Sequence, residues 1–395
     1  MSQQPRASGV RFVNADLGGG ADWLCTAGSR IAAAGCAGSE ADLVVDLNGD
    51  RLLPGLINAH DHLQLNTLPP LESDFQWGNA QEWICAVNAR RQADQSFEAR
   101  VAVPLDERLL IGAVKNLLSG VTTVAHHDPL YPFLAGGQFP LRVVTEYGWS
   151  HSLFIDGEEA VRDSYRSTPP GWPWIIHAAE GVDESAATEI SRLDLLGCLG
   201  PNTLIVHGIA VDRAQRARLE RAGAGLIWCP SSNMRLFGRT ADVADFVDRG
   251  RVALGTDSRL SGSRDLLCEL SAARTTSSLD EVTLESLVTR NAAAMLRLPD
   301  RGSLAAGARA DLLVLPARMP LSQATRADIR LVMIGGNALY ADPQYARIMA
   351  PVTEWTEVSV DGAPKMLESS LAAALFHSQV SESGLHTPEA IWRAA

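Results

Sequence analysis

Two histidines separated by one residue, His60 and His62, end a short apolar stretch of the chain. This stretch, residues 56–59, follows a Pro-Gly pair and has the pattern of a buried strand. Because alternate side chains of a strand point to the same side, both imidazoles can reach one point beyond its C-terminal end. Two converging imidazoles are typical metal ligands. The pair alone also fits two histidines at an exposed strand end, so the rest of the chain must decide.

Three further apolar stretches end in residues with metal-binding or acid-base chemistry. They end in His177, which Glu180 follows three positions later, in His207 and in Asp257. In a parallel barrel the C-terminal ends of all strands surround one mouth. The alternative, that these residues support other groups or cap helices, fits each one singly but not their joint occurrence.

The residue types define the chemistry that such a mouth could support. His60, His62, His177 and Asp257 offer three nitrogens and one oxygen, a set suited to zinc, iron or another divalent ion. A divalent ion lowers the pKa of a water molecule that it binds. Glu180 is then close enough to transfer a proton, Asp257 to hold the water, and His207 to orient it or polarise the electrophile.

Alternating apolar and helical patterns over residues 55–300 predict the elements that position these residues. Strands are expected at 121–125, 141–145, 174–177, 203–206, 225–228 and 252–255, and helices at 108–118, 184–196, 213–222 and 240–249. This alternation and the length of the region predict a (β/α)8 barrel. A doubly wound open sheet is the alternative, but no G-x-G-x-x-G follows the first strand.

The two ends of the chain carry short strand patterns. Residues 9–53 read as a small β-meander with strands at 10–13, 31–34 and 43–47, and residues 303–340 contain strands at 311–315 and 329–334. We expect both ends to share one small β domain, rather than to be separate decorations. A helix is expected near 366–377, followed by a polar tail. The predicted domains are therefore 1–54 and 302–360 (β-sandwich), 55–301 (barrel) and 361–395 (helix and tail).

Composition excludes several classes of protein. The chain has 395 residues and a net charge of -12, which disfavours a general nucleic-acid or anionic-membrane binder. Its cysteines form no C-x-x-C pair, so neither a cysteine zinc site nor a disulfide scaffold is indicated. With no signal-peptide pattern and no run of 18 apolar residues, we expect a cytoplasmic protein with a small-molecule substrate. We also expect a homodimer.

The motifs resemble the amidohydrolase superfamily, in the branch of cytosine, guanine and adenosylhomocysteine deaminases and triazine chlorohydrolases. The resemblance covers residues 8–340. It rests on the stretches 53–62 (LPGLINAHDH), 119–124 (SGVTTV), 177–180 (HAAE), 206–208 (VHG), 229–233 (CPSSN), 255–258 (GTDS), 289–293 (TRNAA) and 302–312 (GSLAAGARADL). It implies a distorted (β/α)8 TIM barrel with a small β-sandwich domain built from both chain ends.

The resemblance also implies one divalent ion, most simply Zn2+ with Fe2+ as the alternative, on His60, His62, His177 and Asp257. Glu180, His207 and Asp257 are the implied catalytic residues. Some relatives bridge two metals with a carboxylated lysine. Here Lys115 falls in a helical pattern and Lys365 in the tail, which closes that route and leaves Glu146 as the remaining candidate bridge.

The chain departs from the deaminase pattern in ways that leave its substrate open. Residues 126–173 are too few for the usual substrate loop, so one strand–helix unit must be short or missing. Other residues that could contact a substrate are His126, His127 and His151, the tryptophans at 77, 83, 149, 172 and 174, and Arg235, Arg259 and Arg264. Each of them is equally consistent with an ordinary structural role.

The function expected is hydrolysis of a non-peptide C–N bond, as in deamination of a small heterocycle or amidine by metal-activated water. The alternative within enzymes is opening or closing of a cyclic amide, amidine or imine on the same site. The alternative of another class is a metal-free binding or interaction protein.

Overall fold

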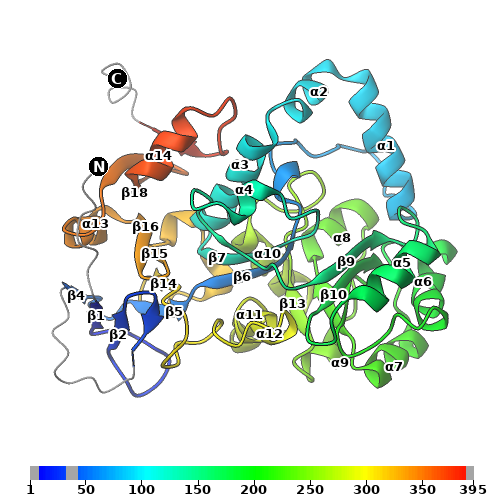
Figure 1. Cartoon of the computed structure of the whole chain (residues 1–395), viewed down its shortest axis with the longest axis horizontal. Coiled ribbons are helices and arrows are strands. Elements are labelled where there is room, and N and C mark those ends of the chain that lie inside the picture. Colours follow the sequence, from blue (N-terminus) through cyan, green and yellow to red (C-terminus); the bar gives the residue numbers. More distant parts are fainter. Residues whose placement is uncertain (1–8, 33–42, 388–395) are drawn as a thin grey trace.

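The computed structural model describes residues 9–32 and 43–387. A β-rich part lies on the left of Figure 1, and a barrel surrounded by helices lies on the right. This arrangement confirms the predicted fold class, a mixed α/β barrel with a β domain formed by both ends of the chain. Among the described helices, none is long and apolar enough to cross a membrane.

The barrel strands run parallel to their neighbours in two hydrogen-bonded groups, β6-β7-β8 and β9 to β13. Their bounds are β6 (Leu56–Asp61), β7 (Val121–His126), β8 (Arg142–Val143), β9 (Gly148–Ser152), β10 (Trp174–Ala178), β11 (Thr203–His207), β12 (Gly225–Trp228) and β13 (Val252–Leu254). Every residue of β6, β7, β10, β11, β12 and β13 is buried, as expected for strands covered on both faces.

The helices mostly connect these strands. They are α1 (Ala80–Ala93), α2 (Gln95–Val101), α3 (Leu105–Leu118), α4 (Pro132–Ala135), α5 (Glu158–Ser167), α6 (Glu184–Leu195), α7 (Arg213–Ala222), α8 (Pro230–Phe237), α9 (Ala244–Val247), α10 (Leu266–Thr276), α11 (Glu281–Leu287), α12 (Arg290–Met295), α13 (Pro343–Met349) and α14 (Ser369–Phe376), with 3-10 turns η1 (Leu63–Leu65), η2 (Leu321–Gln323) and η3 (Arg326–Asp328). Local signals set several ends. The helix α7, for example, starts at a capping box between Asp212 and Gln215 and stops at left-handed Gly223.

No helix separates β8 from β9. Only residues 144–147 lie between them, and the Val144 N–H still donates to the Val124 carbonyl at 2.9 Å. The chain therefore passes almost directly from pairing with β7 to pairing with β10. This confirms the expectation that one strand–helix unit between residues 126 and 173 is short or missing.

The barrel closes where β6 meets β13. The Thr256 N–H donates to the His60 carbonyl at 2.9 Å, and the His62 N–H donates to the Asp257 carbonyl at 3.0 Å. Gly255 permits this approach, since a Cβ at that position would lie 2.6 Å from the Cβ of His60. Two candidate ligand segments that are far apart in the sequence are therefore joined by backbone hydrogen bonds.

The β domain combines both ends of the chain. One sheet has the order β3-β2-β1-β4, and the other has the order β19-β17-β18-β16-β15-β14-β5. Their strands are β1 (Val10–Val13), β2 (Leu24–Ala27), β3 (Arg30–Ile31), β4 (Leu43–Asp46), β5 (Arg51–Pro54), β14 (Leu312–Leu315), β15 (Leu331–Ile334), β16 (Asn337–Ala341), β17 (Trp355–Val360), β18 (Ala363–Glu368) and β19 (Leu385–His386). Antiparallel pairing of β5 with β14 joins the two ends, and Phe12, Val45 and Leu52 share a core with Val314 and Met333.

Three predicted elements need correction. The helix expected at 240–249 is only the short α9, because Ala241 and Val243 pack into the core before the helix begins. The helix expected at 366–377 begins at Ser369, and the preceding residues belong to β18, which pairs with β17. Lys365 therefore lies in a strand and not in a tail, and the region after residue 360 is more than a helix and a tail. Residues 33–34 of the strand expected at 31–34 lie outside the described residues. The domain boundaries themselves stay a prediction.

Because β14 completes the sheet beside β5, a chain truncated after residue 302 should fail to fold. It would lose β14 to β19 and leave Leu52 and Val45 without most of their core. We expect the 1–302 chain to be insoluble, or to lack a cooperative unfolding transition by circular dichroism, under conditions in which the full chain unfolds cooperatively. A soluble 1–302 chain with a cooperative transition would contradict the shared domain.

Candidate active site

Four buried side chains converge at the mouth of the barrel. The ligand atoms of His60, His62, His177 and Asp257 all lie within 4.8 Å of one another. The Nε2 atom of His177 is 3.2 Å from that of His60 and 3.3 Å from that of His62. The Oδ1 atom of Asp257 is 3.6 Å from the Nε2 atom of His60 and 3.6 Å from that of His62. Two ligands of a tetrahedral zinc ion at ordinary bond lengths lie about 3.4 Å apart. The spacing therefore fits one divalent ion between these four atoms.

The second nitrogen of each histidine has its own partner. His62 Nδ1 is 2.7 Å from the carboxylate of Asp128, and His177 Nδ1 is 2.8 Å from the backbone carbonyl of His151. Both partners are acceptors, so each Nδ1 carries a proton and each Nε2 faces the cluster. Partners of this kind fix the orientation of metal-binding histidines in proteins.

The hydrogen-bond acceptor of His60 is a second histidine, His127. His127 Nε2 donates to the carbonyl of Ser150 at 2.9 Å, which leaves the Nδ1 atom of His127 as an acceptor. The Nδ1–H of His60 donates to this atom at 3.1 Å. His127 therefore holds His60 in the tautomer that points its Nε2 lone pair at the cluster.

Asp257 is held through the oxygen that faces away from the histidines. Its Oδ2 atom accepts hydrogen bonds from Ser232 at 2.8 Å and from Ser261 at 2.5 Å. Burial alone would raise the pKa of this carboxyl, but its interactions with His60 and the neighbouring histidines hold it well below its usual value. Asp257 is therefore a carboxylate with Oδ1 directed at the cluster.

Burial sets the protonation of the histidines. It lowers the pKa of His60 to about 4 and that of His177 well below its usual value, so both rings are neutral at pH 7. Burial also lowers the pKa of His62, but the hydrogen bond and charge of Asp128 outweigh this effect and raise the pKa to about 9. The Asp128–His62 pair is thus the strongly polarised member of the cluster.

Left-handed backbone occurs where three of these strands end. Ala179, His207 and Asp257 have φ values of 54°, 73° and 58°. Such a conformation costs a residue other than glycine on the order of 1–3 kcal/mol and is found mainly where surrounding structure enforces it. Each of these three residues lies at the end of a buried strand or within three residues of it, at the mouth of the barrel.

Glu180 and His207 stand beside the cluster. Glu180 Oε1 is 3.5 Å from His207 Nε2, while the Nδ1–H of His207 donates to Asn233 at 2.8 Å. Burial, together with the carboxylates of Asp257 and Glu189, raises the pKa of Glu180 well above its usual value. His207 Nε2 is buried without a hydrogen-bond partner, so this nitrogen is available to a ligand.

A buried ionic network lies beneath the cluster. Lys115 on α3 is fully buried, and its Nζ atom is 3.1 Å from Asp61 and 2.8 Å from Asn66. Asp61, between the two strand histidines, also accepts hydrogen bonds from Asn116 and from Asn58. Lys115 thus holds the histidine strand from below through Asp61 and Asn66.

The cluster opens into a cavity of about 320 Å3. Its walls are largely apolar and include Leu65, Leu68, Phe97 and Leu260, with α1 contributing Trp83, Ile84 and Val87. Polar groups at its surface are those of Gln64, Asn88, Arg91, Arg108, His151 and Ser258, besides His62, Asp128, His177, Glu180, His207 and Asp257. The Oε1 of Gln64, the Nε1 of Trp83 and the Nδ1 of His151 are buried without hydrogen-bond partners, so the cavity offers a ligand both donors and acceptors.

The remaining candidates have different places. Trp83 lines the cavity, whereas Trp174 is buried in the core and Trp149 contacts His127 at its ring edge. His127 supports His60, His151 lines the cavity, and His126 is buried beside Tyr131. Glu146 is exposed between β8 and β9 and is outside the cluster. The remaining residues in this group, Trp77, Trp172, Arg235, Arg259 and Arg264, do not line the cavity.

Sequence reasoning assigned no role to several supporting residues. Asp128, Ser232 and Asn233 stand in stretches that it did single out, the His-His-Asp end of β7 and the CPSSN segment. Their polar side chains directly after apolar strands were the available signal. Lys115 and Asn58 gave none, since their partners come from other segments.

Comparison with known proteins places this site in context. The profile of the amidohydrolase family matches residues 174–339. A 5-methylthioadenosine/S-adenosylhomocysteine deaminase of Haloarcula marismortui is 29% identical over 70% of this chain and 75% of its own. A 5'-deoxyadenosine deaminase of Methanothermobacter thermautotrophicus is 25% identical over 70% and 76% of the two chains.

Solved structures share the fold at low identity. An adenosine deaminase of Xanthomonas campestris with bound zinc gives a TM-score of 0.69 at 18% identity and covers 88% of this chain and 97% of its own. A mutant atrazine chlorohydrolase of Arthrobacter aurescens, complexed with zinc and atraton, gives 0.68 at 17% identity and covers 87% and 99%.

The barrel and its His/His/His/Asp cluster define a hydrolase with a site for a divalent metal ion. Residues 174–339 carry an amidohydrolase family domain, as the motifs of the chain predicted.

Removal of Lys115 tests the network beneath the site. Lys115→Met leaves the buried Asp61 carboxylate without its cation, and breaking a buried pair costs about 3–5 kcal/mol. We expect urea denaturation to show a loss of this size, and metal content to fall as His60 and His62 lose their support. The double variant Lys115→Met/Asp61→Asn removes both charges and should recover much of the lost stability. A Lys115→Met protein as stable as wild type would show that the pair does not hold the strand.

Proposed function

We propose that this chain is a metal-dependent aminohydrolase that deaminates a small heterocyclic or amidine substrate. The observation that carries the proposal is the position of Glu180, whose carboxyl stands 3.5 Å from His207 Nε2 beside the metal cluster and lines its cavity. Deamination requires a group that takes a proton from water and moves it to the departing nitrogen, and burial, which raises the pKa of this carboxyl above its usual value, makes it a stronger base for that task.

The proposed metal ligands are His60, His62, His177 and Asp257, and the proposed occupant is one Zn2+ ion. Their donor set and spacing fit zinc, and the neutral rings of His60 and His177 direct lone pairs at one point. Once bound, the ion would supply Lewis-acid activation of water. The predicted homodimer and cytoplasmic location stay predictions.

The residues around the cluster have separate proposed tasks. Glu180 removes a proton from the attacking water and delivers it to the nitrogen that leaves. Asp257, anchored by Ser232 and Ser261, orients the water. His207, fixed by Asn233, contacts the substrate at its free Nε2 and orients the electrophilic carbon.

The cavity supports a planar substrate of modest size. Apolar side chains and the Trp83 ring can cover the faces of a heterocycle, while Gln64 and Arg108 offer hydrogen bonds to its edge. Arg108 forms no ion pair with a carboxylate in the described part of the chain and donates to the carbonyls of Val103 and Gln64. Adenosine-type nucleosides are the first class to test, since relatives are named for them; pterins, pyrimidines and amidines follow.

Metal analysis separates the enzyme from a metal-free binding protein. We expect one equivalent of a divalent ion per chain by elemental analysis, and near-complete loss of it in His177→Ala. The exposed His377 provides a matched control, and His377→Ala should retain the ion. Two equivalents in wild type, or none after supplementation with zinc or iron, would refute the single-ion site.

Substitution of Glu180 separates chemistry from binding. Glu180→Gln keeps the size of the side chain but cannot transfer a proton, so kcat for ammonia release should fall by at least about 100-fold. Metal content and substrate binding should persist. Glu184→Gln, at an exposed position in α6, is the control.

If Glu180→Gln retained more than about a tenth of wild-type kcat, the loss would be smaller than the expected loss of about 100-fold. Glu180 would then have no part in the proton transfer. Loss of the metal would instead make Glu180 a ligand. A substrate consumed without release of ammonia would favour ring opening or closing on the same site.

A further inference from the structure

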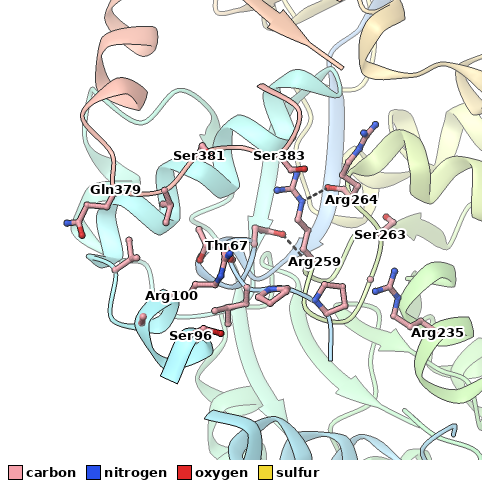
Figure 2. A pocket seen from close by; sticks show the side chains of 18 residues that line it. Thr67, Ser96, Arg100, Arg235, Arg259, Ser263, Arg264, Gln379, Ser381 and Ser383 are labelled. Atoms are coloured by element: carbon pink, nitrogen blue, oxygen red, sulfur yellow. Dashed lines mark hydrogen bonds between the residues drawn. The ribbon is translucent and has the colours of Figure 1, made fainter. Parts of the chain in front are cut away.

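A second, larger hollow of about 920 Å3 adjoins the wall of the active-site cavity. It lies between the loop that follows η1, helix α2, the loop after β13 and the segment 379–383 (Figure 2). Leu68 lines both spaces, but the side chains of the metal cluster line only the smaller one. We call the larger space the arginine pocket, after Arg100, Arg235, Arg259 and Arg264 in its lining.

The lining of the arginine pocket carries positive charge without negative charge. Four arginines line it and no aspartate or glutamate does, in a chain with a net charge of -12. Arg259 is neutralised from behind by Glu382, and Arg264 by Asp265 and Asp361. Among the described residues, neither Arg100 nor Arg235 has a carboxylate within ion-pair distance. Two guanidinium groups on different elements, α2 and α8, therefore remain uncompensated at this pocket.

Hydroxyl groups complete a polar lining. Ser96, Ser263, Ser381 and Ser383 line the pocket with Thr67 (Figure 2). Thr67 is only 8% exposed, and its Oγ1 atom is buried without a hydrogen-bond partner. A buried hydroxyl in a folded protein normally has a partner, so Thr67 is a polar position in the wall of the pocket that the chain leaves unpaired. Arg100 lies next to it, with Nη1 3.4 Å from the Thr67 carbonyl.

We propose that the arginine pocket binds a small polyanion, a molecule with two or more phosphate or carboxylate groups. Guanidinium groups pair with both kinds of anion through two parallel hydrogen bonds, which an ammonium group cannot do. Arg100 and Arg235 supply the charge that the chain leaves uncompensated, and the serine hydroxyls of the lining supply additional donors. The ligand is distinct from the substrate at the metal cluster, because the ligand atoms of that cluster do not reach this pocket.

The arginine pocket also borders the hydrogen-bond network that lies beneath the metal cluster. Asn66 lines it, donates to Asp61 at 2.8 Å and accepts from Lys115 at 2.8 Å. It also accepts the backbone N–H of Arg259 at 3.1 Å. An anion bound here therefore contacts the same loop that braces the strand of His60 and His62.

Calorimetric titration of the full-length, metal-loaded protein tests the proposal, with pyrophosphate and citrate as the two probes. We expect at least one to bind wild type with a Kd below about 1 mM. Arg100→Gln/Arg235→Gln should weaken this binding at least about 10-fold, since each change removes a charge-assisted contact. Tighter binding of pyrophosphate would identify a phosphate-bearing ligand, and tighter binding of citrate a polycarboxylate.

Two further variants separate a built site from general attraction. Arg166→Gln/Arg274→Gln removes the same charge at exposed positions on α5 and α10 and should leave binding unchanged. Arg100→Lys/Arg235→Lys keeps the charge but loses the paired hydrogen bonds, and should weaken binding to an intermediate degree. Unchanged thermal unfolding of each variant verifies its fold. Absence of binding by wild type, equal binding by the glutamine pocket variant, or an equal loss in the control variant would overturn the proposal.

Discussion

The active site depends on the contact that closes the barrel between β6 and β13. His60 and His62 end one of these strands, Asp257 follows the other, and backbone hydrogen bonds join the two ends directly. Gly255 makes the contact possible, since a side chain there would collide with His60. Once this seam is closed, His177 and His207 need only occupy the ends of β10 and β11 to complete the ring. The positions of the reactive groups thus follow from the fold of the barrel and not from flexible loops.

The polar groups of the site are satisfied outwards and left open inwards. The outward nitrogens of the three histidines donate to Asp128, His127 and the His151 carbonyl. Two serines donate to the outward oxygen of Asp257, and Asn233 accepts a hydrogen bond from the outward nitrogen of His207. The inward atoms, which include two neutral imidazole nitrogens and a carboxylate oxygen, then lie a little over 3 Å apart in a buried space. Such an arrangement is unfavourable without a cation. The same hydrogen-bond partners that orient these side chains therefore also favour binding of a metal ion.

Much of this could be predicted from the sequence, because metal-binding side chains at strand ends are local features. The barrel, the shared β domain and the residues of the cluster were inferred from apolar strands and the polar residues that directly follow them. Contacts between distant segments could not be inferred in this way. Lys115 looked like one position in a helix, and only the packing of α3 on η1 brings it to Asp61. Likewise, only the placement of helix α1 brings Trp83 to the cavity. The chain at Met366 continues a sheet where its apolar pattern predicted a helix.

Helix α1 shows how molecules could enter and leave a site that is otherwise enclosed. Six of its residues line the cavity, yet none of its side chains is fully buried. Its apolar contacts are made mainly by Trp83 and Val87, and local opening of a single surface helix has a lower free-energy cost than unfolding of a core element. The strands β6, β10, β11 and β13, which carry or precede the cluster and are fully buried, would not take part. Substrate exchange can therefore be fast while the groups that perform the reaction stay fixed, so that gating and chemistry are assigned to separate parts of the molecule.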